Sequence, residues 1–395
     1  MTEAKTAVVR ASKTRLHLNN EQATAMYSLC RTGHFVYNQG LAHWKNEYRA
    51  GRKVSTFGIN KWWSANCDEI APWIKKEGMN KAALNGVITQ SLGNAIKNFF
   101  DKNRKGGRAG YPKFKNRHSR IAIRFPNIAI RQAHINGTTL TLPSGMGTAR
   151  MGSPVRFPGR LMATTIARDG EKWYVIFFIE VALADMPVPK NLPVPGTSVG
   201  IDVGVAKHAA LSTGEVYHSP RPFYKYRDRL ALEQRRLSVM EKGSNRWKKQ
   251  KAKVAKVNRK IANVRRHYNL QVANDITGKY ELVAIEDLKL KNMTASAAGT
   301  EDAPGKNVKA KSGLNRSLLD GGFYQFRTLL EQAAEKRGGT VVAVNPAFTS
   351  QTCVACGHVS KENRKTQQDF CCVACGYEAN ADVNAARNIL LRAAG

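Results

Sequence analysis

Four cysteines near the C-terminal end have the spacing of a metal site. Cys353 and Cys356 form one C-x2-C pair, and Cys372 and Cys375 form another after fifteen intervening residues. Each pair is followed by glycine, and four such thiolates satisfy tetrahedral Zn²⁺. Because a site closed by four sulfurs leaves no open position, we expect one zinc ion with a structural role. We interpret Cys371 as a bystander, and an exchange of register with Cys372 stays open.

Three carboxylates stand out because they lie in or beside apolar segments. Asp202 interrupts the strand-like run 198–205, Glu286 closes the apolar run 282–286, and Asp382 lies near the start of the last predicted helix. Taken singly, Glu286 also fits an exposed strand end, and Asp382 fits a helix cap. Taken together, the three could hold a pair of divalent cations, which activates water and stabilises the leaving oxygen in phosphodiester cleavage.

The composition indicates a polyanionic partner. The 395 residues include 63 Lys plus Arg against 29 Asp plus Glu, a net charge of +34, which favours nucleic acid ahead of an anionic membrane. Residues 246–266 hold ten basic residues and no acid, so phosphate contact is favoured over a merely solvated helix face. Residues 102–120 mix aromatic and basic side chains, which favours an RNA or single-strand contact over a mobile surface loop. The predicted nucleic-acid contacts are Lys81, Arg104, Lys105, Arg108, Tyr111, Lys113, Lys115, Arg246, Lys249, Lys253, Lys256, Arg259 and Lys260.

Membrane insertion and secretion are not expected. No run of about eighteen apolar residues occurs, and Met1 to Arg10 lacks the apolar core of a signal peptide. In the cytosol or nucleus, clustered cysteines bind zinc more often than they form disulfides, so the metal interpretation is favoured over a redox one.

The elements that must position these residues divide at a proline-rich stretch, residues 187–195. Before it, alternating apolar runs predict a small antiparallel β-barrel or sandwich with a helical insertion. After it, strands alternate with helices, which indicates an α/β sheet, with single helical stretches expected at 221–279 and 315–337. The result is a multidomain chain of α+β and α/β parts. The expected domains are 1–18 with 102–190 (β domain), 19–101 (helical insertion), 191–347 with 379–395 (α/β domain) and 348–378 (zinc segment).

Four short segments carry a resemblance to a known family. They are Gly200-Ile-Asp-Val-Gly204, Ala284-Ile-Glu-Asp-Leu288, Thr349-Ser-Gln-Thr-Cys-Val-Ala-Cys-Gly357 and Asn380-Ala-Asp-Val-Asn-Ala-Ala-Arg-Asn-Ile389. In order and spacing they resemble the RuvC-type motifs and zinc ribbon of the TnpB family of transposon-encoded nucleases, which are relatives of the type V CRISPR effectors. The chain departs from the family pattern in the doubled Cys371-Cys372 and in the loop 294–311.

The resemblance implies a ribonuclease H-like (RuvC) domain with an inserted zinc ribbon, preceded by a wedge-like β-barrel that carries a helical recognition insertion. In this family pattern Asp202, Glu286 and Asp382 bind two Mg²⁺ ions. A guide RNA from the transposon end would direct cleavage of double-stranded DNA beside a short transposon-adjacent motif. The implied form is a monomeric ribonucleoprotein in the prokaryotic cytoplasm, associated with the nucleoid when on DNA.

Other functions fit part of the same sequence. A guide-RNA-loaded repressor without cleavage would have lost one of the carboxylates, and all three are present. A DNA transposase would use the same carboxylates to join strands rather than to break them. A zinc-ribbon transcription or ribosomal factor fits the positive charge but leaves the three acids unexplained.

Overall fold

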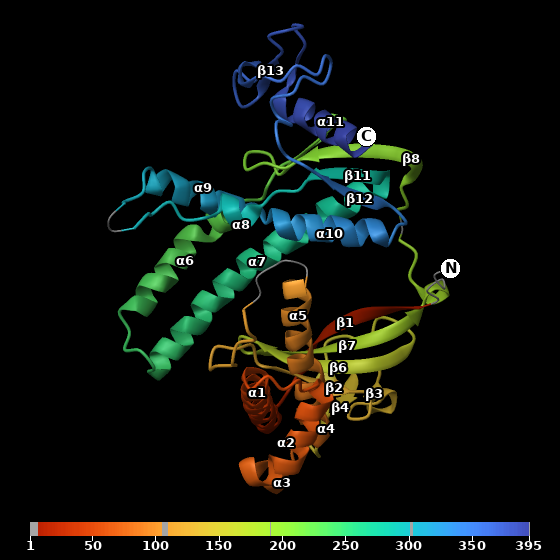
Figure 1. Ribbon diagram of the computed structural model, residues 1–395, viewed down its shortest axis with the longest axis vertical. Helices are drawn as coiled ribbons and strands as arrows, with labels where there is room; N and C mark the ends of the chain where they lie inside the picture. The colour runs from red at the N-terminus through yellow and green to blue at the C-terminus, as the bar shows by residue number, and fades with distance from the viewer. Residues whose placement is uncertain (1–6, 105–109, 190, 301–302, 395) are drawn as a thin grey trace. The chain divides into compact units, whose positions relative to one another are not determined.

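The computed structural model describes residues 7–104, 110–189, 191–300 and 303–394, without the side chains of residues 102–104. It divides into two compact units, Met1–Pro187 and Val188–Gly395, which are treated separately below (Figure 1). Within the described residues, no helix combines the length and the apolar character needed to cross a membrane.

The first unit combines an antiparallel sheet with a group of helices. The described strands follow the order β2-β6-β7-β1-β5-β4-β3, with every neighbouring pair antiparallel. No pairing of β2 with β3 is seen among the described residues, so closure into a barrel stays a prediction. The elements are β1 (Ala7–His17), α1 (Asn20–Arg49), α2 (Thr56–Ile70), α3 (Trp73–Lys76), α4 (Lys81–Gly86), η1 (Val87–Leu92), α5 (Gly93–Arg104), β2 (Ala122–Pro126), η2 (Gln132–His134), β3 (Ile135–Asn136), β4 (Thr139–Thr141), β5 (Thr148–Met151), β6 (Arg160–Asp169), β7 (Lys172–Ala182) and η3 (Leu183–Asp185).

One continuous core joins these helices to the sheet. It includes Trp63 and Ile88 from the helices and Phe125, Ile166 and Phe177 from the strands, all almost completely buried. The alternation predicted from the sequence is visible in β7, where every second residue is buried. Although the helices separate it from the other strands in sequence, β1 lies between β7 and β5.

The second unit is built on a mixed sheet with the strand order β10-β9-β8-β11-β12. Strands β8, β11 and β12 are parallel, whereas β9 and β10 add on antiparallel at one edge. Its elements are β8 (Val194–Asp202), β9 (Ala209–Leu211), β10 (Val216–Tyr217), α6 (Pro222–Ser238), α7 (Asn245–Lys279), β11 (Tyr280–Glu286), α8 (Leu290–Met293), α9 (Val308–Gly321), α10 (Phe323–Glu335), β12 (Thr340–Val344), η4 (Lys361–Asn363), β13 (Asp369–Cys371), β14 (Glu378–Asn380) and α11 (Ala381–Ala394).

Helices cover both faces of this sheet (Figure 1). Ile201 and Ile285 face α7 and α10, where they pack with Ile276, Phe326 and other apolar side chains. On the opposite face, Ala284 packs against α11. The sheet is therefore the middle layer of three, as expected for an α/β arrangement.

Two helical stretches that the sequence predicts as single are broken. Residues 239–244 separate α6 from α7 and reverse the chain, so that Leu230, Val257 and Ile261 close a small core inside a helical hairpin. In the other stretch, Gly322 adopts a left-handed conformation (φ 66°) between α9 and α10. Glycine tolerates that conformation without a steric penalty, so α9 ends there and α10 begins as a separate helix.

Candidate active site

Asp202 and Glu286 end two neighbouring parallel strands. Ile201 of β8 is in register with Ile285 of β11, so the acidic residues that follow them lie at the same edge of the sheet. Side chains alternate between the faces of a strand. Because both isoleucines face α7 and α10, the two carboxylates are directed to the α11 side.

Asp382 reaches this edge from the first turn of α11. The helix lies so close to β8 that a Cβ atom on Gly200 would be 1.9 Å from the carbonyl oxygen of Ala386. Glycine is therefore required there, since any side chain would push α11, and Asp382 with it, away from Asp202. The Asn380 side chain fixes the start of the helix by accepting hydrogen bonds from the backbone N–H groups of Asp382 (3.2 Å) and Val383 (3.4 Å).

The charges of the other two carboxylates act on Asp202. Burial, together with the charges of Glu286 and Asp382, raises the pKa of Asp202 to about 7, against the opposing effect of Arg364 and Lys207. Burial also raises the pKa of Glu286, and a hydrogen bond from Thr349 partly offsets this. A buried carboxylate whose charge is disfavoured by two acidic neighbours suits a divalent cation, which prefers oxygen ligands. The residues present thus fit a magnesium site.

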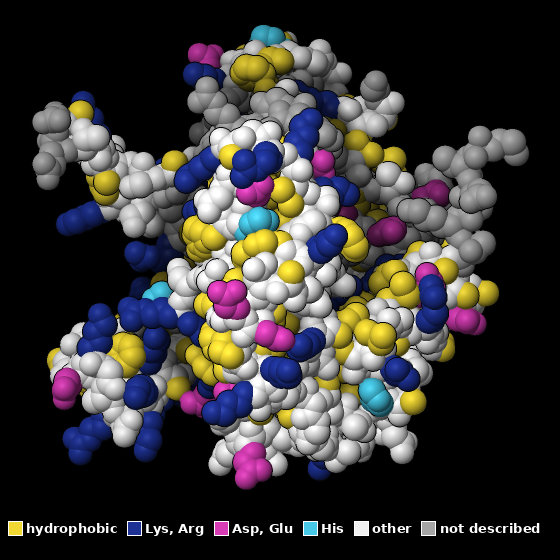
Figure 2. Space-filling view, turned by 60° about the horizontal axis from the view of Figure 1, so that its bottom comes forward, with side chains coloured by type: hydrophobic (Ala, Val, Ile, Leu, Met, Phe, Trp, Pro, Cys, Tyr) yellow, Lys and Arg dark blue, Asp and Glu magenta, His cyan; other side chains and the backbone are white. Residues whose placement is uncertain are grey.

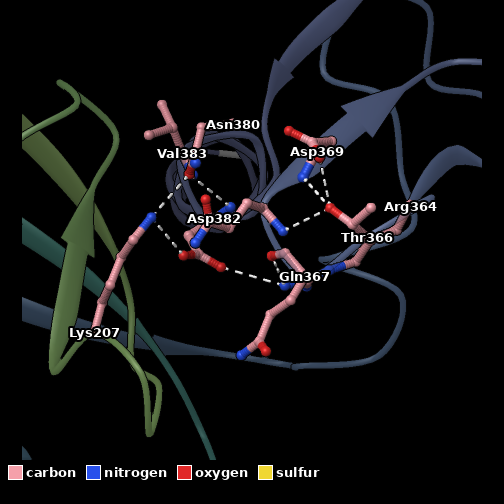
Figure 3. A network of polar contacts seen from close by, with 9 residues as sticks. Lys207, Arg364, Thr366, Gln367, Asp369, Asn380, Asp382 and Val383 are labelled. Carbon is pink, nitrogen blue, oxygen red and sulfur yellow. Dashed lines mark hydrogen bonds and ion pairs between the residues drawn. The ribbon is translucent and has the colours of Figure 1, made fainter.

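Two basic residues contact Asp382 in this structure (Figure 3). Lys207 Nζ, from the loop between β8 and β9, lies 3.0 Å from Oδ2, and Arg364 Nη2, from the zinc segment, lies 3.3 Å from Oδ1. Arg364 also donates to the backbone carbonyl of Gln367 at 2.8 Å, which orients the guanidinium. Sequence reasoning missed both residues, because neither the loop nor the segment between the cysteine pairs indicates which charged side chain returns to the carboxylates.

The four cysteines come together as the sequence predicts. Their sulfur atoms all lie within 4.8 Å of one another, with Cys353 Sγ 3.7 Å from Cys375 Sγ and Cys356 Sγ 3.6 Å from Cys372 Sγ. Among the described residues, no other group of three or more His, Cys, Asp or Glu side chains brings its possible metal-binding atoms this close together. Cys371 is free and half-buried and lies outside it.

Each cysteine pair is held in a turn of the same geometry. The N–H of Gly357 donates to the carbonyl of Cys353, and the N–H of Gly376 donates to that of Cys372, both at 2.9 Å. Both glycines have positive φ, 76° and 71°, which explains why glycine follows each pair. A closed set of four sulfurs in two such turns is suited to structural Zn²⁺.

The zinc segment is anchored to the carboxylate edge. Asn384 and Asn388 of α11, both buried, donate side-chain hydrogen bonds to the backbone carbonyls of Thr352 (2.8 Å) and Thr349 (2.9 Å). The hydroxyl of Thr349 donates to Glu286 Oε1 at 2.6 Å. Thr349 belongs to the segment that carries the family resemblance, but its position before Cys353 in the sequence does not indicate that it contacts Glu286.

Replacement of Thr349 by valine is expected to slow the DNA cleavage that the family resemblance implies by at least about tenfold, because a hydrogen bond to a charged group contributes roughly 1.5–3 kcal/mol. Thr349→Ser keeps the hydroxyl and should keep most of the activity. Single-turnover cleavage rates over a Mg²⁺ titration would measure the effect. Equal rates for the valine and serine variants would show that the hydrogen bond to Glu286 is dispensable.

The predicted nucleic-acid contacts of the second unit lie along α7. Their side chains are exposed except for that of Arg259, which is half-buried. In Figure 2, Lys and Arg side chains crowd the lobe at the lower left, which is the tip of the α6–α7 hairpin. The exposed members of the predicted set are Arg246, Lys249, Lys253, Lys256 and Lys260.

The structure describes only some of the nucleic-acid contacts predicted for the first unit. Asn38 of α1 holds the segment that follows residue 110 by accepting from the N–H of Lys115 (2.7 Å) and donating to its carbonyl (2.9 Å). Tyr111 stacks on Phe99 with 5.0 Å between ring centroids, yet it remains 48% exposed. The other predicted residues are Lys113 and Lys81, both exposed, Arg104, whose side chain is not described, and Lys105 and Arg108, which lie outside the described residues.

Three stretches of the chain match known protein families. Residues 181–297 match a family described as "Probable transposase", residues 323–389 match "Cas12f1-like, TNB domain", and residues 8–53 match "Helix-turn-helix domain". The second stretch includes Asp382 and all four clustered cysteines. The third corresponds here to β1 followed by α1.

Two curated relatives extend over most of the chain. The chain is 39% identical to the "Putative RNA-guided DNA endonuclease InsQ" of Escherichia coli K12 over 97% of its own length and 92% of the relative. It is 29% identical to the "Putative RNA-guided DNA endonuclease" of Streptomyces pristinaespiralis over 97% and 89%. Among solved structures, a Cas12f1–sgRNA–target DNA complex shares the α+β fold with a TM-score of 0.56 at 15% identity, covering 98% of this chain and 99% of that one. On the likeness to the Escherichia coli relative, the chain belongs to the TnpB family of transposon-encoded RNA-guided nucleases.

Proposed function

We propose that this protein is an RNA-guided DNA endonuclease that hydrolyses phosphodiesters of target DNA beside a short transposon-adjacent motif. The observation that carries the proposal is the meeting of Asp202, Glu286 and Asp382 at one edge of the sheet. All three carboxylates are present in a chain whose full-length relatives are called RNA-guided DNA endonucleases. A repressor that no longer cleaves would not need to keep them.

The three carboxylates act together in the proposed reaction. Asp202, whose pKa the charges of the other two raise, would hold Mg²⁺ together with Glu286 and Asp382. Bound Mg²⁺ supplies an activated water for in-line attack and stabilises the leaving 3′ oxygen. Thr349 orients Glu286. Lys207 and Arg364 contact Asp382 and would be available to phosphate oxygens once metal neutralises that carboxylate.

We also propose the domain assignment that the family suggests. Parallel β8, β11 and β12 with an antiparallel hairpin at one edge are compatible with a ribonuclease H-like (RuvC) domain. The four cysteines support an inserted zinc ribbon. The proposed domains are a wedge-like domain (1–18 and 102–190), a recognition insertion (19–101), a RuvC-like domain (191–347 and 379–395) and a zinc ribbon (348–378).

The proposed partners are a guide RNA from the transposon end and double-stranded target DNA, bound by a monomeric ribonucleoprotein. The exposed Lys and Arg side chains of α7 support this (Figure 2), since contacts to phosphates supply affinity without reading sequence. Base pairing with the guide would supply the sequence specificity. Action in the prokaryotic cytoplasm, on nucleoid DNA, follows from the same proposal.

Neutralising part of α7 is expected to weaken the salt dependence of nucleic-acid binding. Replacing Lys249, Lys253 and Lys256 by alanine should lower the slope of log K against log salt by about 2 to 3, because each phosphate contact contributes about 0.9. Replacing the same three residues by arginine preserves the charge and should preserve the slope. An unchanged slope in the alanine variant would place the phosphate contacts elsewhere.

The proposed function is tested by purifying the protein from cells that carry its transposon and sequencing the bound RNA. We expect a discrete RNA whose 3′ part can be rewritten to redirect cleavage of a plasmid library with randomised flanking sequence. Double-strand breaks at the matching site and a short preferred flank are the expected result. Absence of a discrete RNA would contradict the guided mechanism, and strand-transfer products in place of breaks would favour a transposase.

A further inference from the structure

A small cavity lies beside the strand that carries Asp202. It has a volume of about 170 Å³, smaller than the usual pocket for a drug-sized ligand and suited to a single nucleotide base or sugar. Gly204, which lines the cavity, comes two residues after Asp202 in the sequence. Its walls include Gly204, Arg221, Tyr224, Ser317, Asp320 and Phe323.

The topology places this cavity at the carboxylate edge of the sheet. Gly204 follows the end of β8, and Phe323 begins α10, which leads back into β12. Since β12 is parallel to β11, the connection between them must return from the end of β11 to the start of β12. The start of α10 therefore lies toward the end of β11, where Glu286 is found. The cavity lies toward the α7 and α10 face of the sheet, because Phe323 of α10 lines it and Arg265 of α7 holds Asp320, whereas the carboxylates face α11. A DNA strand with one phosphate at the carboxylates would reach the cavity by crossing this edge of the sheet.

The walls of the cavity combine an aromatic ring, hydroxyl groups and a guanidinium. Tyr224 is 38% exposed, and its hydroxyl lies 2.9 Å from Ser317 Oγ. Arg221 is exposed, and among the described residues no carboxylate pairs with it. An accessible ring beside an unpaired cation is the arrangement that single-stranded nucleic acid binds by stacking and phosphate contact.

A buried carboxylate holds the walls in place. Asp320, which is 4% exposed, accepts from the backbone N–H of Phe223 at 2.9 and 3.0 Å and from Arg265 Nη2 at 3.1 Å. These bonds fix the start of α6 against α9 and α7, and Arg265 neutralises the charge of Asp320. Arg221 is thus the lining residue whose charge is left for a ligand.

The backbone of Arg221 is strained. Its φ of 42° lies in the left-handed region, which is uncommon for a residue with a side chain. Pro222, which follows it, opens α6, and Asp320 fixes the next N–H. The surroundings therefore force arginine into a conformation that glycine would adopt more readily, and the guanidinium is kept at the mouth of the cavity at this energetic cost.

We propose that this cavity is a subsite for a nucleotide near the scissile phosphate on the same strand, with its base on the Tyr224 ring and its phosphate on Arg221. The inference rests on the proposed function. The base must be unstacked to enter, so the subsite takes a single-stranded segment of the target DNA. It positions the strand, whereas the carboxylates carry out the chemistry.

The test combines abasic nucleotides in the DNA with substitutions in the cavity. In the guide-loaded wild-type protein, an abasic nucleotide at one position near the cut should slow single-turnover cleavage at least about fivefold, the effect of losing one stacked base. Arg221→Gly, which suits the left-handed backbone, and Tyr224→Ala should slow cleavage of intact DNA similarly and should be insensitive to the abasic nucleotide. Tyr224→Phe keeps the ring and should keep the sensitivity.

Arg227→Gln is the matched control, because Arg227 is exposed on the same helix but does not line the cavity. It should behave as wild type, and thermal melting curves would show that every variant folds. The subsite would be overturned if no position of the abasic nucleotide slowed cleavage by the wild-type protein. It would also be overturned if the abasic nucleotide slowed cleavage by Arg221→Gly as much as by the wild type.

A binding experiment separates failure of the subsite from failure of guided cleavage. Free protein is photo-crosslinked to a single-stranded oligonucleotide that contains 4-thiothymidine, and the attached peptide is identified by mass spectrometry. Attachment to the peptide of Tyr224, reduced in Arg221→Gly, supports the subsite even if no guided cleavage is found. Crosslinking that avoids this peptide overturns the subsite while leaving the nuclease proposal untouched.

Discussion

Asp202→Ala is expected to abolish guided DNA cleavage while leaving binding of RNA and target DNA intact. The negative charges of Glu286 and Asp382 both raise the pKa of Asp202, so Asp202 lies within the electrostatic influence of both. Its removal takes away one of the three carboxylates that would hold Mg²⁺. Since such ions supply several kcal/mol of transition-state stabilisation, the cleavage rate should fall at least about a thousandfold.

The measurement pairs single-turnover cleavage of a labelled duplex with a gel-shift assay of the same ribonucleoprotein. Asp202→Asn keeps the shape of the side chain and should lose cleavage equally, because an amide does not replace a carboxylate as a ligand of divalent cations. Asp228→Ala serves as the control, since Asp228 is 88% exposed on α6. If Asp202→Ala cut within tenfold of the wild-type rate, the carboxylates of the sheet edge would not be the catalytic site.

The carboxylates that we propose as catalytic could be singled out in the sequence because they conflict with their apolar surroundings. A charge at the end of a buried strand is costly unless it has a function or a partner, and this applies to Asp202 and Glu286 directly. The parallel pairing of β8 with β11 follows from the alternation of strands and helices. The need for glycine at position 200 could not be predicted from the sequence, because only the structure shows that the backbone of Ala386 lies against it.

The remaining contacts of the site depend on how distant segments meet. Lys207 and Arg364 are two basic residues among 63, and composition gives no reason to single them out. Their pairing with Asp382 needs the β8–β9 loop and the zinc segment to approach from opposite sides (Figure 3). The break at Gly322 could be anticipated from its residue type. The periodicity of apolar residues on both sides of it favoured a single helix instead.

Cys372→Ser is expected to lose the zinc ion and to unfold the zinc segment. Zinc binding contributes about 10–16 kcal/mol to the folding of small zinc-dependent peptides, far more than the few hydrogen bonds that hold the segment to α11. Unfolding would also release Thr349 from Glu286 and Arg364 from Asp382. Cleavage should therefore be lost with the zinc, even though the zinc itself takes no part in the chemistry.

Cys371→Ser is the matched control, since the two cysteines are adjacent but only Cys372 belongs to the four-sulfur group. Elemental analysis of the purified variants should find one zinc ion in Cys371→Ser and none in Cys372→Ser, and cleavage should follow the zinc content. Loss of zinc in Cys371→Ser with retention in Cys372→Ser would mean that the register of the second pair is shifted by one residue. Because Gly376 follows Cys375 in the same turn in which Gly357 follows Cys356, such a shift would break the matching geometry of the two turns, and we expect the register found here to hold.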